Sequence, residues 1–298
     1  MLVGLVGNAL AAPIGASGIA VPVHDFGQEC QDPRYPALAG PWIVGCGPSG
    51  RVDRALSLES GRELRLPASL SAPALADGLV LSVGLEAAII RLEESGARQL
   101  DLPLVFSASS APPATNGTLA AMLSEGRASV WTLEDRSRPL YDARPAAWFP
   151  PALSTTHLAW VQDAGEDLED IWGLDLRSDR PRPIPLALGP SSQRHVVGSG
   201  HFLAWVEPEA IVLLETDSGE RTRIPARTGF SAPPSLWEGV VCWEERPTHP
   251  PHEEGDGVDI LCSDRLRADG PGHQRWPSRF GPWLLYRQDG ELWLRTAP

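Results

Sequence analysis

The stretch His157–Leu176, HLAWVQDAGEDLEDIWGLDL, decides the fold of this 298-residue chain. Its first half is an apolar segment that ends at Trp160-Val161, and its second half contains the apolar segment that begins at Ile171. Acidic residues separate the two segments. Two apolar runs joined by a short polar connection are typical of a β-hairpin.

Weaker copies of this hairpin occur before and after it. The fourth residue of each first strand marks seven copies, at Gly45, Ser82, Met122, Trp160, Trp205, Trp243 and Tyr286. Successive marks are 37 to 45 residues apart. A repeat of this length built from short strands predicts the blades of a β-propeller. No segment has the sustained apolar spacing of a helix, so we expect an all-β chain.

Seven copies predict seven blades, and six is the alternative if the second or third copy is divided wrongly. The seventh copy ends after Glu291–Leu294 and lacks an outer strand. The isolated run Ile19–Val23 has the β-type composition to supply that strand, and it would close the ring by joining the C-terminal blade. We therefore expect a single propeller domain over residues 19–298.

The N-terminal residues predict export. Met1–Leu10 is apolar, and Ala9-Leu10-Ala11 followed by Ala12-Pro13 has the small residues of a signal-peptide cleavage site. Residues 1–18 are therefore interpreted as a signal or leader segment, and an uncleaved apolar N-terminus is the alternative. A bacterial periplasmic or extracellular location follows from the first interpretation and a cytoplasmic one from the second.

The four cysteines form two local pairs, Cys30 with Cys46 and Cys242 with Cys262. The repeat alignment places the second pair nearly opposite each other on adjacent antiparallel strands. Two disulfides in an oxidising compartment are one hypothesis, and four reduced thiols are the other.

Charge and hydropathy exclude some partners. The net charge of −13 argues against nucleic acid, which is bound by neutralising phosphates with basic side chains. No stretch of 18 residues is apolar throughout, so no membrane span is predicted. We expect a monomer.

The fourth copy resembles the blades of TolB-like, or PD40, propellers, a WD40-like repeat family. The residues that carry the resemblance are Leu158–Val161, Asp170–Leu176 and the trailing Arg182–Ile184. The fifth and seventh copies are similar. The Ser-Pro-Asp-Gly turn of the family is missing, and only Asp289-Gly290 keeps its second half. The resemblance implies the architecture, export, and binding of proteins or surface polymers, but it transfers no individual binding residue.

Eight tryptophans occupy equivalent strand positions, which predicts that they pack between blades; stacking on a carbohydrate is the alternative for one or two of them. These residues are Trp42, Trp131, Trp160, Trp172, Trp205, Trp243, Trp283 and Trp293.

Two loops are candidates for contact with a partner, because function in a propeller is carried by loops on a rigid ring. The first is an acidic run that could hold calcium but lacks the Asp-x-Asp-x-Asp-Gly order of a calcium loop. The second has two imidazoles beside carboxylates, but no third ligand that would complete a zinc or nickel site. Their residues are Asp163, Glu166, Asp167, Glu169 and Asp170 in the first, and His249, His252, Glu253 and Glu254 in the second.

Catalytic motifs are missing from the sequence, which has no Gly-x-Ser-x-Gly, His-Glu-x-x-His or P-loop pattern. We therefore expect a non-catalytic, exported scaffold that binds a protein or surface polymer through its loops. The alternative is a hydrolase or lyase that acts on a polysaccharide or lactone with channel carboxylates, and a structural repeat domain of a larger assembly is a third possibility. Three or more Asp, Glu or His side chains converging on the channel would favour the enzyme. No cofactor is predicted beyond the calcium hypothesis.

Overall fold

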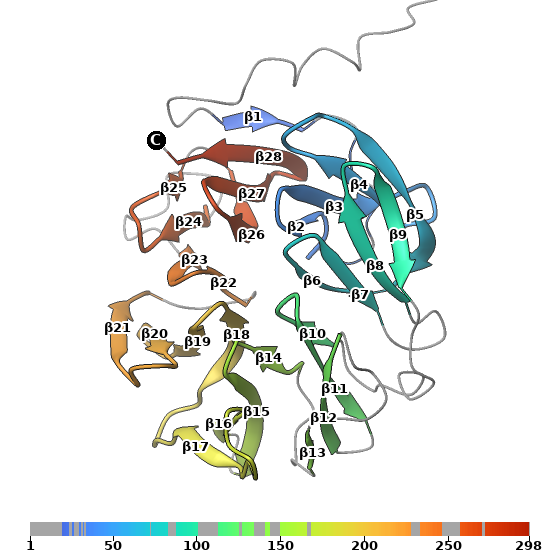
Figure 1. The fold of residues 1–298 in the computed structure, drawn as a ribbon. Helices are drawn as coiled ribbons and strands as arrows, with labels where there is room; N and C mark the ends of the chain where they lie inside the picture. Colours follow the sequence, from blue (N-terminus) through green and yellow to red (C-terminus); the bar gives the residue numbers. More distant parts are fainter. Residues whose placement is uncertain are drawn as a thin grey trace, which may run out of the picture.

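The chain is a seven-bladed β-propeller (Figure 1). The computed structural model describes residues 20–23, 26, 30, 32, 34–71, 73–82, 88–100, 113–124, 127–133, 141–143, 150–165, 168–227, 233–245, 257–269 and 272–297. The described residues form 28 strands, arranged in seven four-stranded sheets, and contain no helix and hence no helical membrane span. The predicted all-β, seven-bladed fold is confirmed, and the six-blade alternative is wrong.

Each sheet is one blade, and we number the blades 1 to 7 in chain order. In blades 1 to 6 the strands follow one another in chain order from the centre of the ring outward, and in blade 7 the N-terminal strand β1 is the outermost (Figure 1). Blade 1 consists of β2 (Ala37–Leu38), β3 (Trp42–Cys46), β4 (Val52–Ser57) and β5 (Glu63–Leu70). Blade 2 consists of β6 (Ala74–Ala76), β7 (Leu79–Ser82), β8 (Ala88–Glu93) and β9 (Gly96–Leu100). Blade 3 consists of β10 (Ala114–Thr115), β11 (Leu119–Ser124), β12 (Arg127–Thr132) and β13 (Tyr141–Ala143).

Blades 4 to 7 repeat the same order. Blade 4 consists of β14 (Ala152–Leu153), β15 (His157–Gly165), β16 (Leu168–Asp175) and β17 (Ile184–Ala187), and blade 5 of β18 (Arg194–Ser199), β19 (Phe202–Glu207), β20 (Ala210–Glu215) and β21 (Arg221–Pro225). Blade 6 consists of β22 (Ser235–Trp237), β23 (Val240–Glu245), β24 (Asp259–Cys262) and β25 (Arg267–Ala268). Blade 7 consists of β26 (Gln274–Phe280), β27 (Trp283–Gln288), β28 (Glu291–Thr296) and β1 (Ala20–Pro22). The deciding stretch is the β15–β16 hairpin, in which Trp160 lies opposite Trp172.

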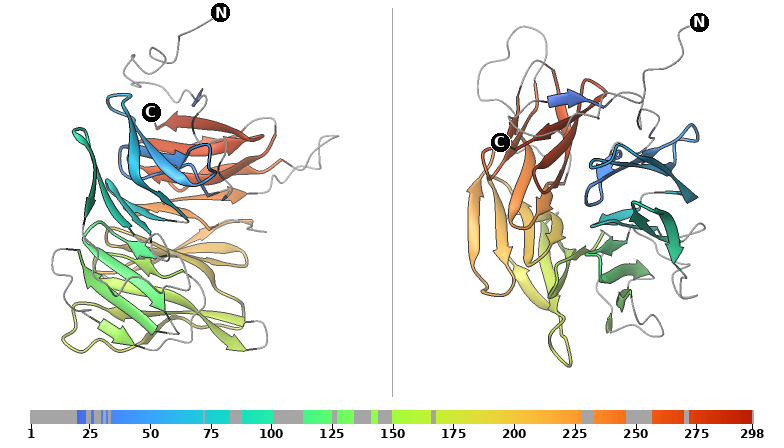
Figure 2. Two further views of the ribbon diagram at one scale, coloured as in Figure 1. Left: turned by 90° about the vertical axis from the view of Figure 1, so that its right-hand side faces the viewer. Right: turned by 45° about the horizontal axis from the view of Figure 1, so that its top comes forward.

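The two ends of the chain meet in blade 7. β1 pairs with β28 in antiparallel fashion, with Ala20 opposite Arg295 and Pro22 opposite Trp293. The Val23 amide also donates to the Leu292 carbonyl at 2.8 Å. The N-terminal strand thus lies beside the C-terminal one at the edge of the last blade (Figures 1 and 2).

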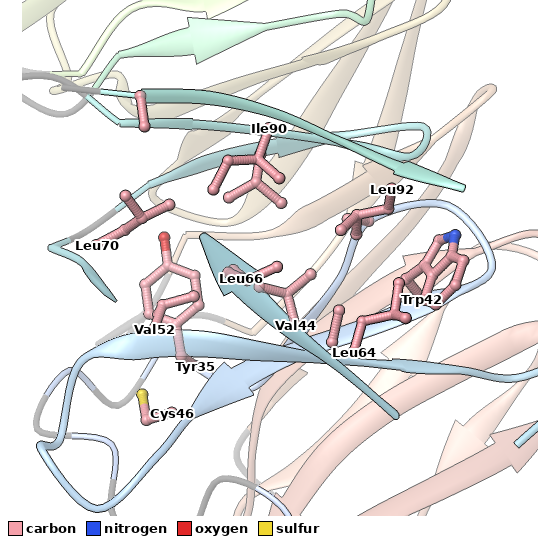
Figure 3. Packing of buried hydrophobic residues seen from close by; sticks show 14 residues of the cluster. Tyr35, Trp42, Val44, Cys46, Val52, Leu64, Leu66, Leu70, Ile90 and Leu92 are labelled. Carbon is pink, nitrogen blue, oxygen red and sulfur yellow. The ribbon is translucent and has the colours of Figure 1, made fainter. Parts of the chain in front are cut away.

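The core lies between blades, because each small sheet presents apolar side chains on both faces. β3 is buried along its whole length. Between blades 1 and 2, Trp42 and Val44 of β3 belong to the same buried cluster as Ile90 and Leu92 of β8 (Figure 3). Burial of this kind contributes roughly 25 cal/mol per Å² of apolar surface, so a blade is stable only against its neighbours.

All eight predicted packing tryptophans belong to such clusters. Trp42, Trp131, Trp160, Trp205 and Trp243 are buried, and the other three are partly buried. The packing prediction is confirmed, since each indole fills space between sheets.

Both hypothesised disulfides are present. Cys30–Cys46 ties the segment before blade 1 to β3, with 5.2 Å between the Cα atoms. Cys242–Cys262 joins β23 to β24, where the two residues are direct cross-strand partners 4.0 Å apart at Cα. The alternative of four free thiols is wrong for this structure.

A buried histidine at the start of β15 predicts acid sensitivity. His157 is 7% exposed, and its Nδ1 lies 3.0 Å from the Thr156 hydroxyl. Burial lowers the pKa of His157 below its usual 6.5, although Asp175 partly opposes this. As the pH falls below 6.5 the unfolded chain takes up a proton that the folded chain does not, so stability falls. His157→Gln should therefore lose less unfolding free energy between pH about 7.5 and about 5.5 in urea titrations. Parallel curves for the two proteins would contradict this.

Candidate functional site

The strongest candidate site is the central channel, which the innermost strands of the blades surround (Figure 1). We call the face of the ring where these strands start the start face, and the face where they turn into the second strands the turn face. A cavity of about 740 Å³ lies at the start face and one of about 510 Å³ at the turn face. The two share Leu75, Thr115, Val197 and Gly198, so they adjoin within the channel.

The start-face cavity has a largely apolar wall. Strands of blades 2 to 5 contribute to it, together with Arg34 before blade 1 and Pro233 before blade 6. Prolines recur just before the inner strands, at Pro113, Pro150, Pro151 and Pro233. Proline fixes its backbone φ angle and has no N–H donor. These positions therefore form a rigid rim and supply no backbone N–H for hydrogen bonds within it. Four charged or titratable side chains complete the lining: Arg34, Glu169, Arg194 and His195.

His195 is placed in the cavity by a bulge in β18. Arg194 pairs with Val206 and Val197 with Ala204, so the strand holds an extra residue between them. His195 takes a left-handed backbone conformation, with φ of 54°, which a residue with a side chain rarely adopts. Bulges and such conformations are common where a strand redirects a functional side chain. Burial lowers the pKa of His195, although Glu169 partly opposes this; the imidazole therefore favours its neutral form, which can both donate and accept a hydrogen bond.

Glu169 links blade 4 to blade 5 next to His195 through an ion pair and hydrogen bonds. Its Oε2 lies 2.8 Å from Nε of Arg194 and accepts a hydrogen bond from the Ser192 hydroxyl at 3.2 Å. The Gln193 amide donates to the Glu169 carbonyl at 2.7 Å. The charge of the carboxylate is thus matched by an arginine, and the pair forms a polar edge on an apolar cavity.

The acidic run predicted from the sequence is divided by the structure. Glu169 lines the cavity, whereas Asp163 is exposed and accepts a hydrogen bond from the Gly165 amide at 2.8 Å. Asp170 is partly buried opposite Gln162. Glu166 and Asp167 lie outside the described residues, so the calcium hypothesis stays untested. The described residues contain no group of three or more His, Cys, Asp or Glu that could hold a metal ion.

The second predicted loop is not described. Its candidate residues, His249, His252, Glu253 and Glu254, all lie outside the described residues.

Sequence reasoning missed Arg34, Arg194 and His195. One signal was available for the last two: Arg275-Trp276 stands in blade 7 where Arg194-His195 stands in blade 5. Trp276 also has a left-handed conformation, with φ of 58°, at a shift in the register of its strand. Two basic–aromatic pairs at equivalent inner-strand positions mark a repeated bulge. The sequence alignment began each copy at the strand that is second in its blade, so it did not include this bulge.

Several solved structures of other proteins are similar to this chain. The structure is similar to puromycin hydrolase, with a TM-score of 0.52 and 17% identity over 84% of this chain and 49% of that one. It is also similar to a catalytically inactive virginiamycin B lyase from Staphylococcus aureus, with a TM-score of 0.48 and 12% identity over 95% of this chain and 99% of that one. A third similar structure is BamB from Moraxella catarrhalis, with a TM-score of 0.44 and 15% identity over 86% of this chain and 82% of that one.

No protein-family model and no curated protein matches the sequence. At these identities the structural likeness extends to the fold alone. The PD40 family therefore stays a resemblance, and the chain is a β-propeller.

Proposed function

We propose that the chain is an exported, non-catalytic β-propeller that binds a segment of a protein partner at its start face. The observation that carries this proposal is the cavity of about 740 Å³, whose size lies within the range of ligand sites. Its apolar wall would bury the body of a bound segment, and the neutral His195 would hydrogen-bond to the backbone of that segment. Because prolines just before the inner strands form the rim, little ordering entropy would be lost on binding.

The positions of the two predicted partner loops in the chain support binding at the start face. Each follows a second strand that ends on the start face, at Gly165 in blade 4 and at Glu245 in blade 6. Residues 163–170 and 249–254 would thus extend the contact around the cavity.

Export is supported by the two disulfides, because structural disulfides form and persist in oxidising compartments. We accordingly place the protein in the periplasm or outside the cell, with residues 1–18 as its leader and residues 19–298 as its domain.

The catalytic alternative finds less support. It calls for three or more Asp, Glu or His side chains that converge in the channel. The described lining supplies Glu169 and His195 in the start-face cavity and Asp77 and Glu238 in the turn-face cavity, so neither cavity brings three of them together. Glu169 is already bonded to Arg194 and Ser192, so it is poorly placed to act as an acid or a nucleophile.

Photo-cross-linking in the native host tests the proposal. A benzoylphenylalanine at position 197, in the cavity wall, is expected to give one discrete protein adduct in the cell envelope. The same residue at the exposed position 222 on the outer strand of blade 5 should give none. Position 197 lines both cavities, whereas Pro150 lies only at the rim of the start-face cavity. Pro150→Trp, which fills that exposed rim, should abolish the adduct at position 197 and so assign it to the start face.

Two other outcomes of the cross-linking experiment would change the proposal. Equal adducts at positions 197 and 222 would contradict binding at the start face. A broad ladder of masses at position 197 would replace the protein partner by a surface polymer.

A further inference from the structure

The turn face carries a second cavity of different chemistry. It is lined by the ends of the inner strands and by the turns that follow them, with a volume of about 510 Å³. Aromatic rings form part of the wall: Trp237 of blade 6 and Phe280 of blade 7 both line it. Their centroids are 5.8 Å apart at an angle of 61°, and Phe280 also stacks on Trp283 at 6.3 Å. The rings are only partly buried, so aromatic surface stays accessible at this mouth.

Two exposed carboxylates lie at the same mouth. Asp77 follows the inner strand of blade 2 and Glu238 that of blade 6. In a ring of seven, blades 2 and 6 stand on nearly opposite sides of the channel. No ion pair joins either carboxylate to a cation among the described residues.

Both carboxylates are held by turns that bond to the neighbouring blade. The Glu238 amide donates to the Ser199 hydroxyl at 3.3 Å, and Glu238 adopts a positive φ of 41°. The amide of Gly78, next to Asp77, donates to the Ala39 carbonyl at 3.3 Å. The Asp77 carboxylate lies so close to Gly40 that a Cβ there would be 2.4 Å from its Oδ1. The two negative groups are thus placed by the ring itself.

The arginine in this cavity does not neutralise them. Arg279 has a side chain only 3% exposed, and its guanidinium bonds to Asp264 at 2.8 Å. Its charge is matched by that ion pair, while Asp77 and Glu238 leave the described lining with two uncompensated negative charges. The whole chain, at −13, adds a long-range field of the same sign.

We infer that the turn-face mouth binds a basic, arginine-containing segment of a protein partner. A guanidinium can lie against the face of an indole or phenyl ring while it donates hydrogen bonds to a carboxylate. The wall of Trp237 and Phe280 with Glu238 beside it offers both interactions within one cavity, and Asp77 across the channel offers an anchor for a second basic residue. This site is separate from the start-face mouth, so the propeller has two chemically different binding faces.

A labelled peptide of alternating glycine and arginine tests the inference, with binding measured by fluorescence anisotropy. The double variant Asp77→Asn/Glu238→Gln should weaken binding about tenfold or more, since hydrogen bonds to charged groups are lost. The matched control is Glu209→Gln/Glu291→Gln, which removes two exposed carboxylates from the start face and gives the same net charge. It should stay within about twofold of the wild type, because only long-range attraction changes.

Two further variants and two contradicting outcomes complete the test. Trp237→Leu should weaken the arginine peptide more than the matching lysine peptide, because stacking favours the planar guanidinium. Equal loss in the two double variants would overturn the inference in favour of bulk attraction, and no binding by the wild type would overturn it outright. Pro150→Trp should bind the peptide normally, so failure of the start-face proposal and failure of this one can be told apart.

Discussion

Gly198→Ala is expected to destabilise the propeller by about 3 kcal/mol, at the upper end of the usual cost of adding a methyl group to a packed site. Gly198 belongs to β18 and lines both cavities of the channel. A Cβ at this position would lie 2.3 Å from the carbonyl oxygen of Leu153 and 2.5 Å from its carbonyl carbon. These are backbone atoms of β14, so the clash cannot be relieved by a side-chain rotation. The inner strands of blades 4 and 5 would have to separate.

Urea unfolding of the purified variant measures the effect. Gly257→Ala is the matched control, because the nearest atom to its Cβ would be the Gly272 carbonyl oxygen at 3.4 Å, an ordinary contact. The control should stay within about 0.5 kcal/mol of the wild type. If Gly198→Ala unfolds at the same denaturant concentration as this control, close approach of the inner strands is not what requires glycine there.

The fold could be predicted because each blade carries its own signal. Trp160 and Trp172 lie opposite each other in one hairpin. The same apolar run recurs in the later copies with Trp205, Trp243 and Tyr286 in place of Trp160. Packing between blades demands this repetition, since a small sheet has two faces to bury. The spacing of the copies then fixed the number of blades without any knowledge of the connections.

The candidate sites were harder to predict because channel residues come from short inner strands. β14 has two residues and β22 has three, too few to show an alternating pattern. Arg194 and Glu169 meet only because blades 4 and 5 stand side by side. The acidic run did contain a cavity residue, Glu169. Nothing in the order of residues in that run distinguishes Glu169 from the exposed Asp163. Asp77 and Glu238, 161 positions apart in the chain, face one mouth only once the ring is closed.

Loss of the blade 6 disulfide should be the other large effect. The double variant Cys242→Ala/Cys262→Ala is expected to lower the free energy of unfolding by about 3 kcal/mol, the chain-entropy value for a loop of this length. The bond closes a loop with a sequence separation of 20, which contains the connection between β23 and β24. Both cysteines are buried, so the variant also leaves a small void in the cluster that packs blade 6 on blade 7. Urea unfolding under non-reducing conditions measures the sum.

The contribution of the bond itself can be isolated in a Cys30→Ala/Cys46→Ala background, where Cys242–Cys262 is the one disulfide left. Dithiothreitol should then lower the unfolding midpoint, and it should have no effect once Cys242 and Cys262 are also replaced. A background protein that keeps its midpoint while thiol titration shows two free thiols would contradict the prediction. The same titration on protein taken from the native cell tests export, because the bond is expected to be formed there only if the chain reaches an oxidising compartment.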